Sequence, residues 1–247
     1  MGTQRLARTG LRLARTGLHL IAAAAIVGLV FPRVPEARRL ALRRQWCRAL
    51  LDILGLRLAV DGAIAPGGVL LVANHVSWVD VIALNAISPA SFVSKDDVAR
   101  WPLIGWLLPR TDTLLLRRDR PRDAQRIGAA IADRLAAGRR IVLFPEGTTS
   151  DGSQVLPFSA ALLEAAVAQR TSVQPIAIAY LERDGTASRA PVYAGDTSFL
   201  QSLLTIVAAD ALTARVRFLP PLSSVGRTRG ELARCARAEV LGALAPA

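Results

Sequence analysis

The chain has 247 residues, enough to bury one good-sized core, and a formal net charge of +12. Its two cysteines, Cys47 and Cys235, are too few for a disulfide framework, and without clustered histidines they exclude the usual zinc-ligand spacing. G-x-S-x-G, H-E-x-x-H, G-x-G-x-x-G and P-loop patterns are absent, which excludes the commonest hydrolase, metalloprotease and nucleotide-site signatures. We therefore expect a reduced, cytosol-facing catalytic protein without a bound metal.

The first fifty residues carry most of the positive charge. They hold ten arginines and one acidic residue, Glu36, and the arginines flank an apolar run of fourteen residues, Leu18–Phe31. No aromatic side chain precedes Phe31 to stack a base, so the segment favours an anionic membrane surface over nucleic acid. The run is shorter than the roughly 20 residues of a spanning helix, and prolines and arginines follow it instead of a small-residue cleavage site. We expect a retained anchor that lies in or dips into the interface, with a cleaved signal peptide as the alternative.

A tandem repeat begins this segment. The heptapeptide RLARTGL occurs at Arg5–Leu11 and again at Arg12–Leu18. Its spacing puts leucines and arginines on separate faces of a helix, which suits a headgroup layer. A recent duplication in a solvated arm is the alternative.

Two prolines, Pro32 and Pro35, interrupt the first helix because proline disrupts helical hydrogen bonding. A second helix is expected over residues 36–56. We therefore expect residues 1–57 to form a basic, apolar two-helix membrane-attachment segment and residues 58–247 to form the catalytic domain.

Beyond residue 57, short apolar runs alternate with turn signals. The spacing predicts an α/β fold, and the continuous apolar strands predict a sheet covered by helices on both faces. Gly138 is expected to cap the first of two helices. The expected strands lie within residues 67–74, 90–95, 111–118, 139–147, 172–181 and 214–222, and the expected helices within residues 122–138 and 158–170.

His75 is the candidate base of the catalytic domain, because the other histidine, His19, lies in the apolar anchor. Ser77 and Asp80 match a capping box that begins a helix. If His75 precedes that helix and Asp80 lies in its first turn, the carboxylate can hold Nδ1 and leave Nε2 free to take a proton. The spacing leaves both interpretations open, a helix cap alone or a cap that also holds a catalytic base.

A second polar stretch, FPEGTTS at residues 144–150, follows another apolar run. It presents the Glu146 carboxylate, hydroxyls and backbone N–H groups at a sheet edge, where ligands of α/β sheets tend to bind. An ordinary polar turn is the alternative.

Together these residues resemble the glycerolipid acyltransferase family, of the 1-acylglycerol-3-phosphate acyltransferase type. NHVSWVD, at residues 74–80, fits its first motif, N-H-x-x-x-x-D, and FPEGTTS fits its third, F-P-E-G-T. LLLRR, at Leu114–Arg118, resembles the second motif, and VQPIAI, at Val173–Ile178, resembles the fourth. In order and spacing the resemblance covers residues 65–185, and it implies a glycerolipid-acyltransferase-like sheet flanked by helices.

The resemblance implies a reaction at the cytoplasmic face of the inner membrane. A fatty acyl group would move from a thioester of acyl-carrier protein or coenzyme A to the free hydroxyl of a lysolipid, most directly 1-acyl-sn-glycerol-3-phosphate. His75 would take the hydroxyl proton and Asp80 would orient His75, so neither a cofactor nor a covalent enzyme intermediate is needed. The implied substrate contacts are Asn74, Lys95, Arg118, Glu146, Gly147, Thr148 and Thr149.

Three positions depart from the family pattern. Members that act on a phosphate monoester commonly have arginine and lysine where this chain has Thr149 and Ser159, and threonine cannot replace an arginine fork on phosphate. Either Lys95 and Arg118 take over the phosphate, or the acceptor lacks a phosphate monoester, as in a lyso-ornithine lipid or a headgroup-bearing lysophospholipid. A catalytically inactive lipid-binding member of the fold is a further alternative. Asp112 stands where the second motif usually has glycine.

Overall fold

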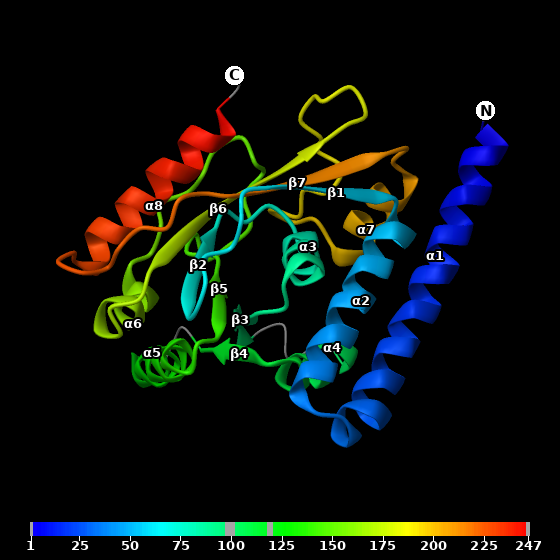
Figure 1. Cartoon of the computed structure of the whole chain (residues 1–247). Coiled ribbons are helices and arrows are strands. Elements are labelled where there is room, and N and C mark those ends of the chain that lie inside the picture. The colour runs from blue at the N-terminus through cyan, green and yellow to red at the C-terminus, as the bar shows by residue number, and fades with distance from the viewer. Residues whose placement is uncertain (1, 97–101, 118–120, 246–247) are drawn as a thin grey trace.

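The computed structural model describes residues 2–96, 102–117 and 121–245. Within these ranges one mixed sheet has the strand order β1-β7-β6-β2-β5-β3-β4 (Figure 1). The strands are β1 (Leu56–Asp61), β2 (Val69–Ala73), β3 (Ser91–Lys95), β4 (Thr113–Leu116), β5 (Arg140–Leu143), β6 (Val173–Leu181) and β7 (Leu212–Phe218). The α-helices are α1 (Gly2–Ala25), α2 (Glu36–Leu54), α3 (Val79–Ile87), α4 (Pro102–Leu107), α5 (Pro121–Ala136), α6 (Glu164–Ala168), α7 (Phe199–Ala208) and α8 (Arg229–Leu244).

The centre of the sheet is parallel. Strands β6, β2, β5, β3 and β4 run in one direction, whereas β7 pairs antiparallel with β6 and β1 follows β7. Every residue of β2 is buried, as the continuous apolar run predicted. Val72 of β2 pairs in register with Leu143 of β5, so the loops that follow these two strands leave the same sheet edge side by side.

Helices cover both faces of the sheet, as the sequence predicted. Helices α2, α3 and α7 pack on one face, around buried residues such as Leu54 and Ile206. Helices α5, α6 and α8 pack on the other, around Ile131 and Leu232. Helix α1 lies outside α2 and farthest from the sheet on its side (Figure 1).

Six predicted strands are confirmed, and one helix prediction is wrong. Residues 158–170 form only a 3₁₀ turn, Ala161–Leu163, and the short α6. The segment starts as loop because the Phe158 side chain is buried in the core and the Ser159 N–H donates to Pro145 O at 2.9 Å. The predicted cap is confirmed, since Gly138 has a left-handed φ of +74° and donates to Leu135 O.

Helix α1 turns three of its four arginines toward the protein, whereas Arg15 is exposed. Arg12 Nη1 donates to Val207 O at 2.9 Å and to Ala209 O at 2.7 Å, and Arg8 pairs with Asp210, all at the C-terminal end of α7. Arg5 donates to a fourth acceptor there, a backbone carbonyl. Cations are stabilised at a helix C-terminus by unsatisfied carbonyls and the helix dipole.

Most leucines of α1 point outward instead, whereas Leu13 packs against the core. Leu6, Leu11, Leu18 and Ile21 are each at least 60 % exposed. Arg5 and Arg12 are bound to backbone carbonyls at the C-terminal end of α7 and Arg8 to the Asp210 carboxylate, so these three arginines face the protein and not a headgroup layer. The apolar side of α1 is the side available to a membrane.

Helix α2 is part of the main core. Cys47 and Leu51 pack in the same cluster as the sheet, and Arg48 donates to Ala86 O at 2.9 Å, at the C-terminal end of α3. Helix α2 ends at Leu54, two residues before the predicted end, because Gly55 turns the chain with a left-handed φ of +80°. A domain boundary at residue 57 stays a prediction.

Candidate active site

The histidine and the aspartate of the first motif form a hydrogen-bonded pair. Strand β2 ends at Ala73, residues 74–77 are irregular, and α3 starts at Val79. His75 thus lies outside the helix with Asp80 in its first turn, and His75 Nδ1 lies 2.8 Å from Asp80 Oδ2. A carboxylate only accepts, so it fixes the proton on Nδ1 and leaves Nε2 as the basic nitrogen. The Asp80 side chain is fully buried, whereas that of His75 is 19 % exposed.

Backbone and side-chain donors surround the Asp80 carboxylate. Its Oδ2 atom also accepts from the N–H groups of Val76 and Ser77, at 2.8 and 2.9 Å. The predicted capping box is only half formed, because Ser77 Oγ accepts from Val79 N–H instead of from the Asp80 N–H. The N–H groups of the irregular turn thus donate to the carboxylate and hold it in place beside His75.

Tyr180 completes this network, and the sequence did not single it out. Its hydroxyl donates to Asp80 Oδ1 at 2.6 Å from the far end of β6. Burial, followed by the charge of Asp80, raises the pKa of Tyr180 well above 10, so the phenol keeps its proton and remains a donor. One sequence signal was present: Tyr180 follows an apolar run in a strand predicted to be buried, and a buried tyrosine usually finds a hydrogen-bond partner.

The third motif holds the backbone of His75. Glu146 Oε1 accepts from the His75 N–H at 2.7 Å, and Oε2 accepts from the Leu156 N–H at 2.9 Å. The Ser150 N–H donates to His75 O at 2.8 Å. Burial raises the pKa of Glu146, partly offset by its two backbone donors. Both Glu146 oxygens are therefore engaged within the protein, which makes Glu146 a positioning residue for His75.

The tight turn of the third motif depends on Gly147. Its φ of +73° is left-handed, and its N–H donates to Phe144 O at 3.0 Å. The Phe144 ring stacks on the His75 imidazole with centroids 3.9 Å apart and planes 15° apart. The Phe144 ring therefore covers one face of the imidazole and helps to hold its orientation. Thr148 is exposed and Thr149 half-buried just beyond the turn.

Two further predicted contacts, Asn74 and Lys95, are described, and neither is hydrogen-bonded to the side chain of His75 or Asp80. Asn74 is buried, and its carboxamide both donates to Ile178 O and accepts from Ile178 N–H, so it ties β2 to β6. Lys95 ends β3, and no hydrogen bond or ion pair joins it to His75 among the described residues. Arg118 lies outside the described residues.

Asp112 adopts the conformation that glycine usually supplies. Its φ is +62°, and its carboxylate accepts from Ser91 Oγ and, at 2.8 Å, from Arg134 Nη2. These contacts, with the positive charge of Arg139, lower the pKa of Asp112 against the opposing effect of burial. Aspartate tolerates the left-handed region better than most residues, so the loop geometry is kept without glycine.

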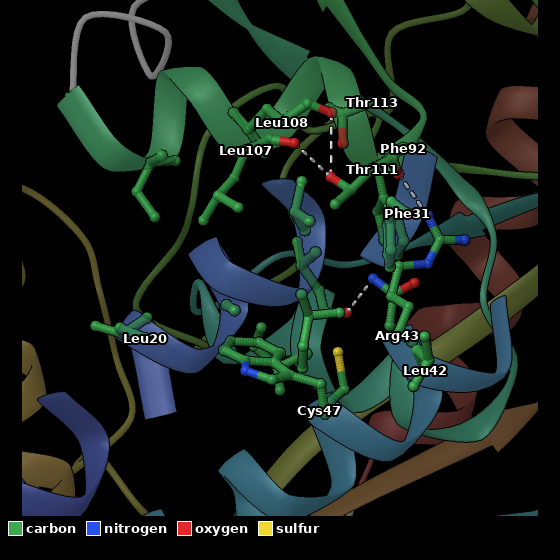
Figure 2. Close-up of a pocket in the computed structure, with 18 residues that line it drawn as sticks. Leu20, Phe31, Leu42, Arg43, Cys47, Phe92, Leu107, Leu108, Thr111 and Thr113 are labelled. Carbon is green, nitrogen blue, oxygen red and sulfur yellow. Dashed lines mark hydrogen bonds between the residues drawn. The ribbon is translucent and has the colours of Figure 1, made fainter. Parts of the chain in front are cut away.

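An apolar cavity of about 170 Å³ lies between the N-terminal helices and the sheet (Figure 2). Helices α1 and α2, strand β3 and helix α4 all contribute to its lining. Its lining is almost entirely apolar, and the space is open on one side.

Comparisons with known proteins agree on one family. The family model described as Acyltransferase matches residues 57–179. The lyso-ornithine lipid O-acyltransferase of Pseudomonas aeruginosa is 37 % identical over 83 % of this chain and 79 % of its own length. The lyso-ornithine lipid O-acyltransferase of Rhodobacter capsulatus is 39 % identical over 78 % of this chain and 72 % of its own length. The 1-acyl-sn-glycerol-3-phosphate acyltransferase of Neisseria meningitidis is 36 % identical over 75 % of this chain and 72 % of its own length.

A solved structure shares the fold. The crystal structure of PlsC, the 1-acyl-sn-glycerophosphate acyltransferase of Thermotoga maritima, superimposes with a TM-score of 0.75 over 98 % of this chain and 95 % of that one. At 17 % identity the likeness concerns the fold alone.

Proposed function

The chain belongs to the acyltransferase family, and we propose that it moves a fatty acyl group from an acyl thioester to the free hydroxyl of a lysolipid. The observation that carries this proposal is the pair of His75 and Asp80, joined at 2.8 Å and held by Tyr180 and Glu146. The pair supplies a general base with a fixed tautomer, a stabilised imidazolium and an accessible Nε2.

The proposed reaction is direct transfer. His75 Nε2 removes the proton from the acceptor hydroxyl while the hydroxyl oxygen attacks the thioester carbonyl carbon. Asp80 stabilises the imidazolium that forms. Collapse of the tetrahedral intermediate breaks the carbon–sulfur bond, and the imidazolium returns its proton to the leaving thiolate. The products are an ester and a free thiol, and the enzyme is unchanged.

We propose an acceptor whose headgroup lacks a phosphate monoester, as in a lyso-ornithine lipid. Thr149 and Ser159 stand where family members that bind a phosphate monoester commonly have basic residues. The Pseudomonas and Rhodobacter relatives are named lyso-ornithine lipid O-acyltransferases. Acylation of 1-acyl-sn-glycerol-3-phosphate is the second candidate. The Neisseria relative, Lys95 at the carboxyl end of β3, and Arg118 in the second motif favour it.

The chain associates with membranes, as lipid-acylating relatives and its apolar helix indicate. Within the described ranges, one helix, Thr3–Arg33, is long and apolar enough to cross a bilayer by length and composition. We place the enzyme at the cytoplasmic face of the inner membrane, because the flanking arginines favour that side. Acyl-carrier protein or coenzyme A is the proposed donor carrier at that face.

The test is acyl transfer by the purified full-length protein in mixed micelles, with lyso-ornithine lipid and 1-acyl-sn-glycerol-3-phosphate offered separately and each donor supplied in turn. We expect a higher kcat/KM for lyso-ornithine lipid. His75→Ala is expected to lower kcat by roughly 10²–10⁴-fold. Undiminished transfer by His75→Ala would overturn the mechanism, and faster transfer to the phosphate acceptor would overturn the headgroup assignment. Lysolipid binding without transfer from either donor would favour the inactive lipid-binding alternative.

A further inference from the structure

We propose that Arg237, in the C-terminal helix α8, is a positioning residue for the catalytic base, and this inference rests on the proposed function. Arg237 lies outside residues 57–179, the part of the chain that the family model matches. Its guanidinium binds the loop of residues 144–160, which contains the third motif. That loop in turn holds the backbone of His75, so a line of hydrogen bonds joins α8 to the base.

The first contact is a fork between Arg237 and two neighbouring carbonyls. Arg237 Nε lies 3.1 Å from Val155 O and 3.0 Å from Leu156 O, and Nη2 donates to Val155 O at 2.6 Å. The Nε and Nη2 donors share one edge of a rigid, planar guanidinium, so they hold both carbonyls in a single geometry. A lysine ammonium has no such edge, which makes arginine the side chain suited to this contact.

Helix α8 gives the guanidinium a fixed base. Leu232 and Val240 of α8 are buried in the same core cluster as Val155, and a capping box at Thr228 fixes the start of the helix. Figure 1 shows α8 running beside β6, on the opposite side of the sheet from α1. Arg237 therefore reaches the loop from an element that is itself held in the core.

The loop needs such a contact because its residues form neither helix nor strand, so no ladder of backbone hydrogen bonds places them. The Val155 carbonyl and the Leu156 N–H belong to one planar peptide unit. Arg237 binds the oxygen of this unit, and Glu146 Oε2 accepts from its N–H at 2.9 Å. A rotation of the peptide unit would break both contacts together, so Arg237 fixes the donor that orients Glu146.

Glu146 passes this constraint to the base. Its other oxygen, Oε1, accepts from the His75 N–H at 2.7 Å. Because the carboxylate is planar, the Leu156 N–H on Oε2 sets the direction in which Oε1 meets His75. Asp80 and Phe144 hold the ring of His75, whereas Glu146 holds its backbone. Arg237 thus acts on the position of His75 Nε2 through Glu146.

The first test is spectroscopic, because the chain has only two histidines, His19 and His75. The untagged full-length protein is labelled with ¹⁵N-histidine in detergent micelles, and the backbone amide signal that persists in His19→Gln belongs to His75. Arg237→Ala should shift the His75 amide signal and leave the His19 signal in place. Arg234→Ala, which changes an exposed arginine of the same helix, is the matched control and should move neither signal.

The second test is a double-mutant cycle in kcat between Arg237→Ala and Glu146→Ala. Arg237→Ala alone should lower kcat by about tenfold with little change in KM, because a displaced base slows the reaction without weakening binding. In the Glu146→Ala background the same change should have almost no effect, because the link is already broken. Arg237→Lys keeps one charged donor and should retain part of the kcat, and it replaces Arg237→Ala in both tests if the alanine variant does not fold.

Three results would overturn the proposal. One is an unmoved His75 amide signal in a folded Arg237 variant, and another is a wild-type kcat in that variant. The third is an equal loss of kcat in both backgrounds, since an effect on stability alone multiplies through the cycle unchanged. Failure of the proposed function has a different signature: the wild-type protein would transfer no acyl group to any lysolipid, while the His75 amide signal would still respond to Arg237→Ala.

Discussion

Tyr180→Phe removes one hydroxyl and almost nothing else, so it isolates the contact between β6 and the catalytic carboxylate. The three other donors to Asp80, His75 Nδ1 and the Val76 and Ser77 N–H groups, all bind Oδ2. The Tyr180 hydroxyl is the partner of Oδ1, at 2.6 Å in a fully buried setting. The variant therefore leaves one oxygen of a buried carboxylate without its donor.

The expected magnitude follows from the charge of the acceptor. A hydrogen bond to an ionised group contributes about 1.5–3 kcal/mol, and at roughly 2–4 °C per kcal/mol for a chain of this size, a loss of about 2 kcal/mol lowers Tm by about 4–8 °C. We also expect kcat to fall by about tenfold, since 1.4 kcal/mol of lost positioning corresponds to that factor. KM should change little, because Tyr180 is buried behind Asp80 and does not reach the acceptor.

The assay pairs thermal unfolding with steady-state acyl transfer at saturating donor. Tyr193→Phe is the matched control, because no hydrogen bond of the Tyr193 hydroxyl is present among the described residues. A Tyr180→Phe protein with the Tm and kcat of the wild type would refute the reasoning. A lowered Tm with unchanged kcat would reduce Tyr180 to a stabilising role alone.

Further predictions concern three other parts of the chain. Burial raises the pKa of Glu146 above its ordinary 4.5, so folding favours the protonated form, and the contribution of Glu146 to stability declines as the pH rises through the raised pKa. Glu146→Gln should therefore flatten the dependence of the unfolding free energy on pH, measured by urea unfolding. An unchanged pH dependence would contradict this assignment. Glu146→Gln should also lower kcat, because one amide oxygen cannot accept from both backbone N–H groups. Cys235 should react with maleimide in the native protein well before Cys47, whose pKa burial raises to about 12; mass spectrometry would show it, and early labelling of Cys47 would contradict it. Arg12→Leu should speed proteolysis within α1 by releasing its contacts with α7, whereas Arg15→Leu, which changes an exposed arginine of the same helix, should not.

The sequence predicted those features that local patterns determine. Continuous apolar runs identified β2 and β5 because each is buried on both sides, and the spacing of His75 and Asp80 placed the base outside a helix with its partner in the first turn. Tyr180 escaped prediction because its partner lies 100 residues earlier in the chain. The positioning role of Glu146 was not predicted for a different reason: its partner is the backbone N–H of His75, and a backbone group carries no sequence signal.

The orientation of α1 shows a second limit of local pattern. The repeat separated most leucines from the arginines that contact the protein, although Leu13 packs against the core and Arg15 is exposed. Which face meets the protein depends on the carbonyls at the end of α7, about two hundred residues later, and no property of the repeat itself reveals them.

The contact between Arg12 and α7 also sets an order of events during synthesis. Arg12 and its acceptor Val207 are separated by 195 residues, so α1 leaves the ribosome long before its docking site exists. During that interval the leucine face of α1 is free to find a bilayer, and the sheet is completed afterwards, since domains assemble as their segments emerge. The catalytic domain is therefore expected to fold against a helix that is already attached, so that newly made enzyme matures at the membrane.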